Sequence, residues 1–498
     1  MIESNKLYPL SVPLFVRGNL CHKSLWLHQH RPELSGQVDE TLRARFDEGY
    51  RVGLFARELF LDGRCITEEA DTVDRQLWLT KKLMNSSVMT LYEPAFKFDS
   101  VLIFPNILCR TETGWTLYDV KSHGMLHPGI LKDVALQYFV LKGLNIQVDR
   151  ICVVHINTDY VLGKSLDVLR LFTVVDVTDR VKMRLNQTRD TVQTMQRVLA
   201  SSVVPKVAIG PHCSKPYECD FKPFCWQHLS DDSVFSISGL SKNQKFTLYE
   251  QGVREMQDMP ASYPLSDEQV AQVRAHREGV PTVNLIGLRD FLGTLHYPLC
   301  FLDFEAFQSA IPLFSGTRPY EQIPFQFSLH IQSGPTAEPI NYSFLASESE
   351  DPRRAFAESL IKLVPENGCI VTYDHHLESQ AMRHLAVLFP DLSRALLKLV
   401  GQIRDLIIPF EKGYLYSPAM RGRYSIKTIL PAFVPELSYE NLVIKNGEMA
   451  ALSFCKLRLS SDAKEKSDIR IALEKYCEMD TYAMVRLLDV LRVFSDRD

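Results

Sequence analysis

The spacing of apolar residues divides the first half of the chain into a helical region and a strand-rich region. Up to about residue 98 the spacing is helical, as in "DETLRARFDEGYRVGLFARELF", residues 39–60. Short β-rich runs follow, and the stretch "PGILKDVALQYFVLKGL" predicts a helix between the second and third of them. These runs are "KFDSVLIF", "GWTLYDVK", "RICVVHIN" and "LRLFTVVDV". The alternation predicts a mixed α/β core.

The second half begins after a polar helix expected at 178–201 and a loop rich in proline and cysteine, "GPHCSKPYECDFKPFCW". Residues 231–295 are polar and helical in pattern, which is typical of a connecting segment. From residue 296 strands and helices alternate again, and the chain ends in a long helix, "IRIALEKYCEMDTYAMVRLLDVLRVF". We therefore expect an α/β multidomain protein divided into residues 1–230, 231–295 and 296–498.

Composition narrows the class of protein without deciding its function. The chain has 498 residues, of which 46% are apolar and 23% charged, as in ordinary folded domains. No apolar run approaches the roughly 18 residues of a membrane span and no secretion signal is evident, so we expect a cytoplasmic protein. The net charge of -4 gives no overall basic field, and any nucleic-acid binding would use local patches. Eleven cysteines without a secretion signal favour thiols or metal ligands over disulfides.

Two acids stand inside the apolar run "YPLCFLDFEAF", residues 297–307. Side chains alternate across a strand, so Asp303 and Glu305 project from one face. Two unit charges about 4 Å apart repel by roughly 4 kcal/mol at an effective dielectric of about 20. The pattern favours a positive partner, most simply a divalent metal. The alternative is the end of a strand at the surface, with both acids solvated.

Further acids lie downstream at helical spacing. Tyr476 and Asp480 are four residues apart on the last helix, and Asp374 and Glu378 are four apart in "CIVTYDHHLESQAM". Taken alone, the Tyr476 and Asp480 pair is also what an ordinary helix face looks like.

With the upstream acids, this set resembles the tyrosine-bearing subclass of the DEDD exonucleases, which have the RNase H-like (DnaQ-type) fold. The resemblance implies that four carboxylates hold two divalent metals, Mg or Mn, and that Tyr476 helps to position water. Glu378 stands where the family usually has aspartate, and Asp374 stands where it usually has asparagine. Asp405 is a secondary candidate. The implied ligands are Asp303, Glu305, Glu378 and Asp480.

The first half carries a second set of charged residues. Asp99 is expected on one strand, and the next strand carries Asp119 and Lys121 on one face. Two acids can hold a hard cation through oxygen, and a lysine can orient a nucleophile or balance developing charge. The alternative is an Asp–Lys pair at the surface, which contributes little energy.

An acidic strand, the turn "TETG", the strand with D-x-K and the helix with "KDVALQYFVL" together resemble the RecB-like branch of the PD-(D/E)XK nucleases. The resemblance implies a restriction-endonuclease-like core and places Gln137 at the edge of the active site. Leu141 stands where the family usually has tyrosine, although Tyr138 is nearby, and the upstream metal-binding histidine is absent. Glu93 is an additional candidate ligand.

Three cysteines recur at intervals of six, Cys213, Cys219 and Cys225, and Cys21 stands alone near the N-terminus. Four thiolates can bind zinc or an iron–sulfur cluster, and either would close a long loop. Scattered buried cysteines are the alternative. One cysteine before the nuclease core and three after it resemble the RecB-like nucleases of CRISPR-associated and AddB type. That resemblance implies a [4Fe-4S] cluster, with zinc left open.

The whole order resembles an uncharacterised bacterial family that fuses these two nucleases through a helical connector. It implies a metal-dependent nuclease that hydrolyses DNA, single- or double-stranded, with two centres, in repair, recombination or defence. The alternatives are an RNA-processing exonuclease and a nucleic-acid-binding or scaffolding protein with inactive centres. A basic patch, which either contacts phosphate or is a solvated turn, is expected at Arg421, Arg423, Tyr424 and Lys427.

Overall fold

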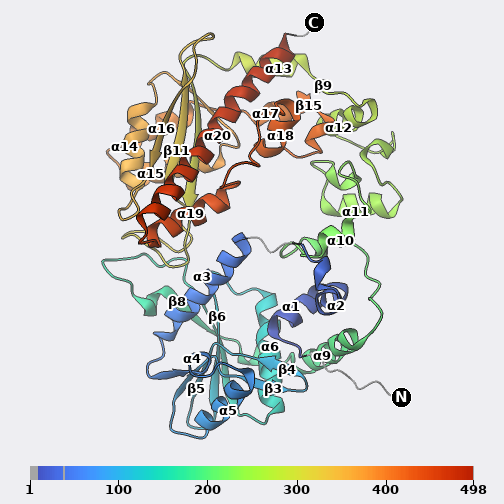
Figure 1. Ribbon diagram of the computed structural model, residues 1–498, viewed down its shortest axis with the longest axis vertical. Coiled ribbons are helices and arrows are strands. Elements are labelled where there is room, and N and C mark those ends of the chain that lie inside the picture. The colour runs from blue at the N-terminus through green and yellow to red at the C-terminus, as the bar shows by residue number, and fades with distance from the viewer. Residues whose placement is uncertain (1–8, 37–39, 497–498) are drawn as a thin grey trace. The chain divides into compact units, whose positions relative to one another are not determined.

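The computed structural model describes residues 9–36 and 40–496, and the chain forms two compact units (Figure 1). Unit 1 comprises Met1–Gln227 together with Ser309–Glu321, and unit 2 comprises His228–Gln308 and Gln322–Asp498. The predicted mixed α/β, multidomain class is confirmed. The segment expected as a connector, 231–295, falls within unit 2, whereas a short segment of the second half belongs to unit 1.

In the part of unit 1 that the structure describes, the larger sheet has six strands in the order β1-β2-β5-β6-β7-β8. Strands β5 and β6 form an antiparallel hairpin through the predicted turn at residues 111–114, and β6 runs parallel to β7. A separate hairpin, β3 with β4, lies outside this sheet. The bounds are β1 Gly63–Cys65, β2 Thr90–Tyr92, β3 Phe96–Phe98, β4 Val101–Ile103, β5 Ile107–Arg110, β6 Trp115–Lys121, β7 Val148–Ile156 and β8 Phe172–Asp176.

Alternation along the strands gives this sheet two covered faces. On β7, Ile151 and Val153 pack with α6, whereas Val154 packs on the opposite face with α3. Asp119 and Lys121 of β6 lie on the α6 face. The helices of unit 1 are α1 Val12–Leu20, α2 His22–His30, α3 Glu40–Arg57, α4 Ile66–Glu69, α5 Val73–Met84, α6 Pro128–Gly143, α7 Val168–Leu171, α8 Thr178–Lys182, α9 Leu185–Ala200 and α10 Lys222–Trp226.

The larger sheet of unit 2 has the order β12-β11-β10-β13-β14. Its central strand, β10, is antiparallel to β11 and parallel to β13. Strand β9, from the expected connector, pairs with β15, which explains why the two segments belong to one unit. The bounds are β9 Thr282–Val283, β10 Leu299–Phe307, β11 Ile323–Gln332, β12 Ile340–Leu345, β13 Cys369–Thr372, β14 Ile403–Asp405 and β15 Leu415–Tyr416.

Helices cover both faces of this sheet, with α14, α15 and α16 on one side and α19 and α20 on the other (Figure 1). Leu302 and Phe304 of β10 pack into the apolar core with α14 to α16. Asp303 and Glu305 therefore project towards the face that α20 covers. The helices are α11 Lys242–Glu250, α12 Asp267–Glu278, α13 Leu285–Gly293, α14 Arg353–Leu363, α15 His376–Leu388, α16 Ser393–Gly401, α17 Ile408–Glu411, α18 Ile426–Phe433, α19 Gly447–Leu459 and α20 Ala463–Ser495.

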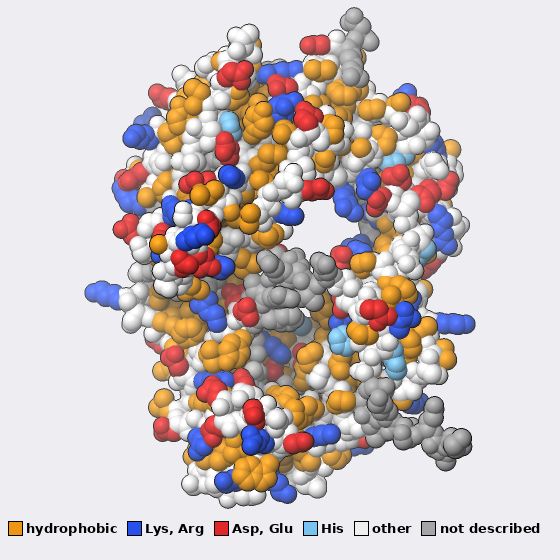
Figure 2. Space-filling model, viewed as in Figure 1, with side chains coloured by type: hydrophobic (Ala, Val, Ile, Leu, Met, Phe, Trp, Pro, Cys, Tyr) orange, Lys and Arg blue, Asp and Glu red, His pale blue; other side chains and the backbone are white. Residues whose placement is uncertain are grey.

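Charges of both signs are interspersed on the face of the molecule that Figure 2 shows, as the small net charge suggests. Among the described residues, no helix combines the length and the apolar composition needed to cross a bilayer.

The aromatic core of unit 2 provides a test of its packing. Phe356 is fully buried, with ring centroids 4.8 Å from Phe304 and 5.2 Å from Phe327. We predict that Phe356→Ala lowers the free energy of unfolding by about 3–5 kcal/mol, because it leaves a cavity. Val387→Ala, at a position 80% exposed, should change it by less than about 0.5 kcal/mol. Urea unfolding measures both, and equal losses would contradict this description of the core.

Candidate functional site

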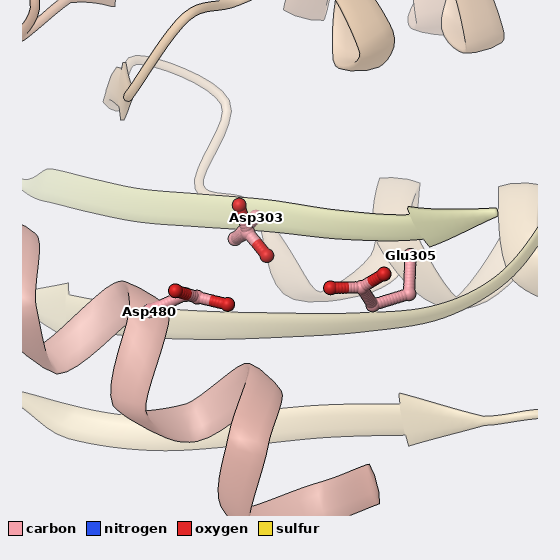
Figure 3. A group of neighbouring side chains, drawn as sticks. All are labelled: Asp303, Glu305 and Asp480. Carbon is pink, nitrogen blue, oxygen red and sulfur yellow. The ribbon is translucent and has the colours of Figure 1, made fainter. Parts of the chain in front are cut away.

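Three carboxylates of unit 2 meet beside β10 (Figure 3). Asp303 and Glu305 come from this strand and Asp480 from the middle of α20, and one oxygen of each lies within 4.8 Å of the others. Glu305 and Asp480 are buried, and Asp303 is partly buried. Among the residues that the structure describes, three His, Cys, Asp or Glu side chains approach within this distance at this site.

Glu378 adds a fourth buried carboxylate from the first turn of α15. Its Oε1 atom accepts a hydrogen bond from the backbone N–H of Phe304 at 3.3 Å, which places it beside the acidic strand. Its Oε2 atom is buried and has no hydrogen-bond partner in the structure. A buried acceptor without a donor costs about 1–3 kcal/mol, and a cation would supply what is missing.

Burial raises the pKa of every carboxyl in this group. Burial and then the neighbouring carboxylates hold the pKa of Asp303 and of Glu305 well above its usual range. Burial raises the pKa of Glu378 to about 8 and that of Asp480 to about 6. Such a set prefers protons or a cation to standing fully ionised, and the predicted acids thus fit a divalent metal.

Two helices, α18 and α19, and the loop between them provide groups that support the acids. Tyr439 donates a hydrogen bond to Asp480 at 2.7 Å, and Lys427 donates one to the hydroxyl of Tyr476 at 2.7 Å. Helix α19 begins at Gly447, where a Cβ atom would lie only 3.3 Å from Glu305 Oε2. Glu305 therefore lies at a helix N-terminus, whose dipole favours a negative charge.

The secondary acids of the sequence have other roles. Asp374 is exposed, in a left-handed backbone conformation with φ of 62°. Asp405 accepts the backbone N–H groups of Asp374 and His375, at 2.9 and 3.0 Å. It thereby fixes the start of α15, the helix that presents Glu378.

The expected basic patch is divided in the structure. Arg421 pairs with Asp231 at 2.5 Å, and the Tyr424 hydroxyl accepts a hydrogen bond from Ser238 at 2.9 Å. Arg423 is exposed, whereas Lys427 reaches the carboxylate centre. The turn at 421–422 has left-handed backbone at Arg421 and Gly422, with φ of 50° and 66°.

Unit 1 assembles the predicted Asp119, Lys121 and Gln137. Lys121 Nζ lies 3.0 Å from Asp119 Oδ2, and Gln137 donates to Asp119 Oδ1 at 2.8 Å. Lys121 also lies 3.6 Å from Asp133, an acid on α6 that the sequence patterns did not single out. Against the lowering effect of burial, Asp119 and Asp133 raise the pKa of Lys121.

Asp99 lies elsewhere, and the expectation that it sits on a strand is wrong. It occupies the exposed turn between β3 and β4, with φ of 47°, because Asp and the following Ser100 tolerate left-handed backbone. Within the described residues, no hydrogen bond or ion pair joins Asp99 to Asp119 or Lys121. The strand that precedes β6 and pairs with it is instead β5, which contains no acid.

The side chains of two nearby residues, Asn106 and Glu93, already have other partners. Asn106, just before β5, accepts the backbone N–H of Val120 through its amide oxygen at 2.9 Å. Glu93, the additional candidate ligand, pairs with Arg57 at 2.8 Å.

The four predicted cysteines of unit 1 converge on one cavity. Cys21 caps α2, Cys225 lies on α10, and Cys213 and Cys219 lie in the loop before it. All four are free thiols, and burial with the nearby thiols raises the pKa of Cys21 and of Cys225. Arg17 of α1 ties this loop in place through Asp220, with contacts of 2.6 and 2.9 Å.

The spacing of the thiols bears on the group they could hold. Sulfurs around one tetrahedral zinc stand about 3.8 Å apart, given a Zn–S distance of about 2.3 Å. Among the described residues, three ligand atoms within 4.8 Å of one another occur at the Asp303 centre and not at the cysteines. The four free thiols thus stand farther apart than they would around one zinc ion.

Known proteins match parts of this chain. Residues 300–425 match a domain of unknown function, DUF2779. The chain is also 23% identical, over 219 residues, to "Uncharacterized protein MG366" of Mycoplasma genitalium. That alignment covers 38% of this chain and 31% of the relative, so the chain matches about a third of that protein's length. The DUF2779 match includes Asp303, Glu305 and Glu378 and ends before Asp480.

The raised pKa of Glu378 predicts how the stability of the metal-free protein depends on pH. Its pKa is 4.5 in ordinary surroundings and about 8 here, so the folded state holds the proton more tightly. Its contribution to stability is complete below about pH 4.5 and is lost as the pH rises towards 8. We predict that Glu378→Gln raises the melting temperature by several degrees more at pH 8.5 than at pH 5, roughly as expected for about 1–2 kcal/mol.

The same experiment has a metal arm. Mn²⁺ added at pH 8.5 should stabilise the parent more than Glu378→Gln, because only the parent offers the fourth carboxylate. An identical pH profile in the two proteins would show that Glu378 is not held protonated at this centre.

Proposed function

We propose that this protein is a metal-dependent nuclease that hydrolyses DNA phosphodiester bonds, with its principal centre in unit 2. The observation that carries the proposal is the convergence of Asp303, Glu305 and Asp480, with buried Glu378 beside their strand and one of its oxygens without a donor. Such a set is costly to bury unless it binds cations. The acids involved are Asp303, Glu305, Glu378 and Asp480.

The architecture around these acids supports the RNase H-like, DEDD-type interpretation. A central strand of a mixed sheet presents two acids, and a C-terminal helix presents Asp480 together with Tyr476 one turn earlier. This is the arrangement that the resemblance implies. Glu378 comes from a helix that starts soon after a parallel strand, β13, so the middle acid also arises next to β10.

Each side chain has a definable task in hydrolysis. Divalent cations at this centre would activate water and stabilise the leaving oxygen. Tyr439 fixes the orientation of Asp480, and Lys427 fixes the hydroxyl of Tyr476. The Lys427 ammonium group is also suited to attract a phosphate oxygen of the substrate.

Unit 1 supplies the second proposed centre, with Lys121 and Asp119 in the D-x-K arrangement of RecB-like nucleases and Gln137 hydrogen-bonded to Asp119. A role in binding nucleic acid without cleavage is the second candidate for this unit. It is favoured by the position of Asp99, the predicted metal ligand, which lies on the turn between β3 and β4 and makes no ion pair with Lys121 among the described residues.

We also propose that the cysteine cavity holds a [4Fe-4S] cluster. Its thiols are free and lie on both sides of the unit 1 core in sequence, so a cluster would tie the N-terminal helices to the loop that follows α9.

The test of the nuclease is digestion of end-labelled DNA with Mg²⁺ or Mn²⁺. We predict that Asp303→Asn and Asp480→Asn each lower the rate by about 10³-fold, because loss of a metal ligand removes several kcal/mol of transition-state stabilisation. The matched control is Asp374→Asn, which alters an exposed acid of the same unit and should retain full activity. RNA oligomers of the same sequence, digested in parallel, show which nucleic acid is preferred. A parent protein that cleaves neither polymer with either metal would overturn the proposal.

The cluster has its own test. Protein purified without oxygen should be brown, with iron and sulfide near four each per chain. Cys225→Ser should lose the colour and most of the iron, whereas Cys109→Ser, a thiol on β5 outside the cavity, should keep both. Stoichiometric zinc in a colourless parent would contradict the prediction.

A further inference from the structure

Unit 1 contains a second carboxylate at its D-x-K site, supplied by a helix rather than by a strand. Asp133 lies on α6 four residues before Gln137, so both side chains are on one face of the helix. Its Oδ2 atom is 3.6 Å from Lys121 Nζ, and Lys121 is also 3.0 Å from Asp119. Burial raises the pKa of Asp133 to about 6, and the nearby Asp119 adds to that effect. Two carboxylates thus approach the same small volume.

The surroundings of this pair contain a buried oxygen that lacks a donor. Gln137 Oε1 has no hydrogen-bond partner, and its side chain is only 3% exposed, whereas the equally buried Asp119 Oδ2 has Lys121 Nζ 3.0 Å away. The Gln137 amide donates through Nε2 to Asp119, which leaves its oxygen free to accept on the same side of the helix. A buried amide oxygen without a donor costs about 1–3 kcal/mol, so the geometry favours a further positive partner beside Gln137.

The other side chains that the sequence or the structure offers for this metal site have different positions or partners. Asp99 lies on the turn of a different hairpin, and Glu93 is paired with Arg57. The oxygen of Asn106 already accepts the N–H of Val120. Asp133 and Lys121 have side chains 18% and 22% exposed, so a small ion has a route from solvent to the site.

We propose that Asp119, Asp133 and the amide oxygen of Gln137 form the divalent-cation site of unit 1. All three metal ligands would be oxygen atoms, which suit hard cations such as Mg²⁺ and Mn²⁺. Lys121 bridges the two carboxylates in the cation-free protein. A bound cation neutralises the acids in its place and leaves the ammonium group available to a phosphate oxygen. The inference deepens the function proposed for unit 1, but the binding of the ion is measurable without any turnover.

The test is a Mn²⁺ titration of the full-length chain, followed by electron paramagnetic resonance of the free ion. It is done in the Asp480→Asn background, which weakens the centre of unit 2. In that background, Asp133→Asn should weaken the remaining site by at least about 10-fold, as loss of a ligand requires. Asp99→Asn is the matched control and should leave the affinity unchanged. Asp133→Glu keeps the charge and should retain part of the affinity.

The outcomes separate this inference from the nuclease proposal. Unchanged Mn²⁺ affinity in Asp133→Asn, with a lower melting temperature, would mean that Asp133 is only an ion-pair partner of Lys121, and the inference fails. If Asp99→Asn weakens Mn²⁺ binding and Asp133→Asn leaves it unchanged, the inference is overturned, and Asp99 is the ligand that the sequence predicted. Either failure leaves the DNA digestion by unit 2 untouched. Far-ultraviolet circular dichroism of each variant confirms that it folds.

Discussion

Repulsion among buried carboxylates is the constraint on which the centre of unit 2 depends. Strand β10 must place Asp303 and Glu305 on one face, because its other face is committed to the apolar core. Helix α20 adds Asp480, and α15 adds Glu378. Neighbouring segments partly offset this negative charge. Asp480 and Glu378 accept hydrogen bonds from the Tyr439 hydroxyl and a backbone N–H, and the Lys427 ammonium group and the start of α19 lie close to the acids. These groups moderate the repulsion, and a cation is what would remove it.

In unit 1 the cysteine loop lies close to the charged site that contains Asp133 and Lys121. Tyr217 lies between Cys213 and Cys219, and burial raises its pKa, to which Asp133 and Asp220 contribute. A loop that Arg17 holds through Asp220 therefore places an exposed aromatic side chain near Asp133. Bases of nucleic acids stack on such rings. The cysteine loop and the D-x-K site thus lie close together in the same unit.

The sequence predicted local patterns well and contacts between distant segments less well. Spacing of two within a strand correctly paired Asp119 with Lys121, and the order of cysteines correctly grouped four thiols. The strand pattern failed at Asp99, because "KFDSVLIF" has no glycine or proline to reveal its turn. Asp133 and Tyr439 were missed because their partners lie on other elements, and only the packing of helices against sheets brings them together. The periodicity of a segment predicts which residues share one face of a helix or strand, but not which residues of other elements pack against that face.

The most direct measurement of the central claim is a crystal structure of the protein soaked in Mn²⁺, with anomalous diffraction data. We expect an anomalous peak among Asp303, Glu305 and Asp480, with Glu378 Oε2 turned to the ion. Catalysis need not occur for this result to appear. Saturating Mn²⁺ with no peak at these carboxylates, in crystals that remain ordered at neutral pH or above, would contradict the account.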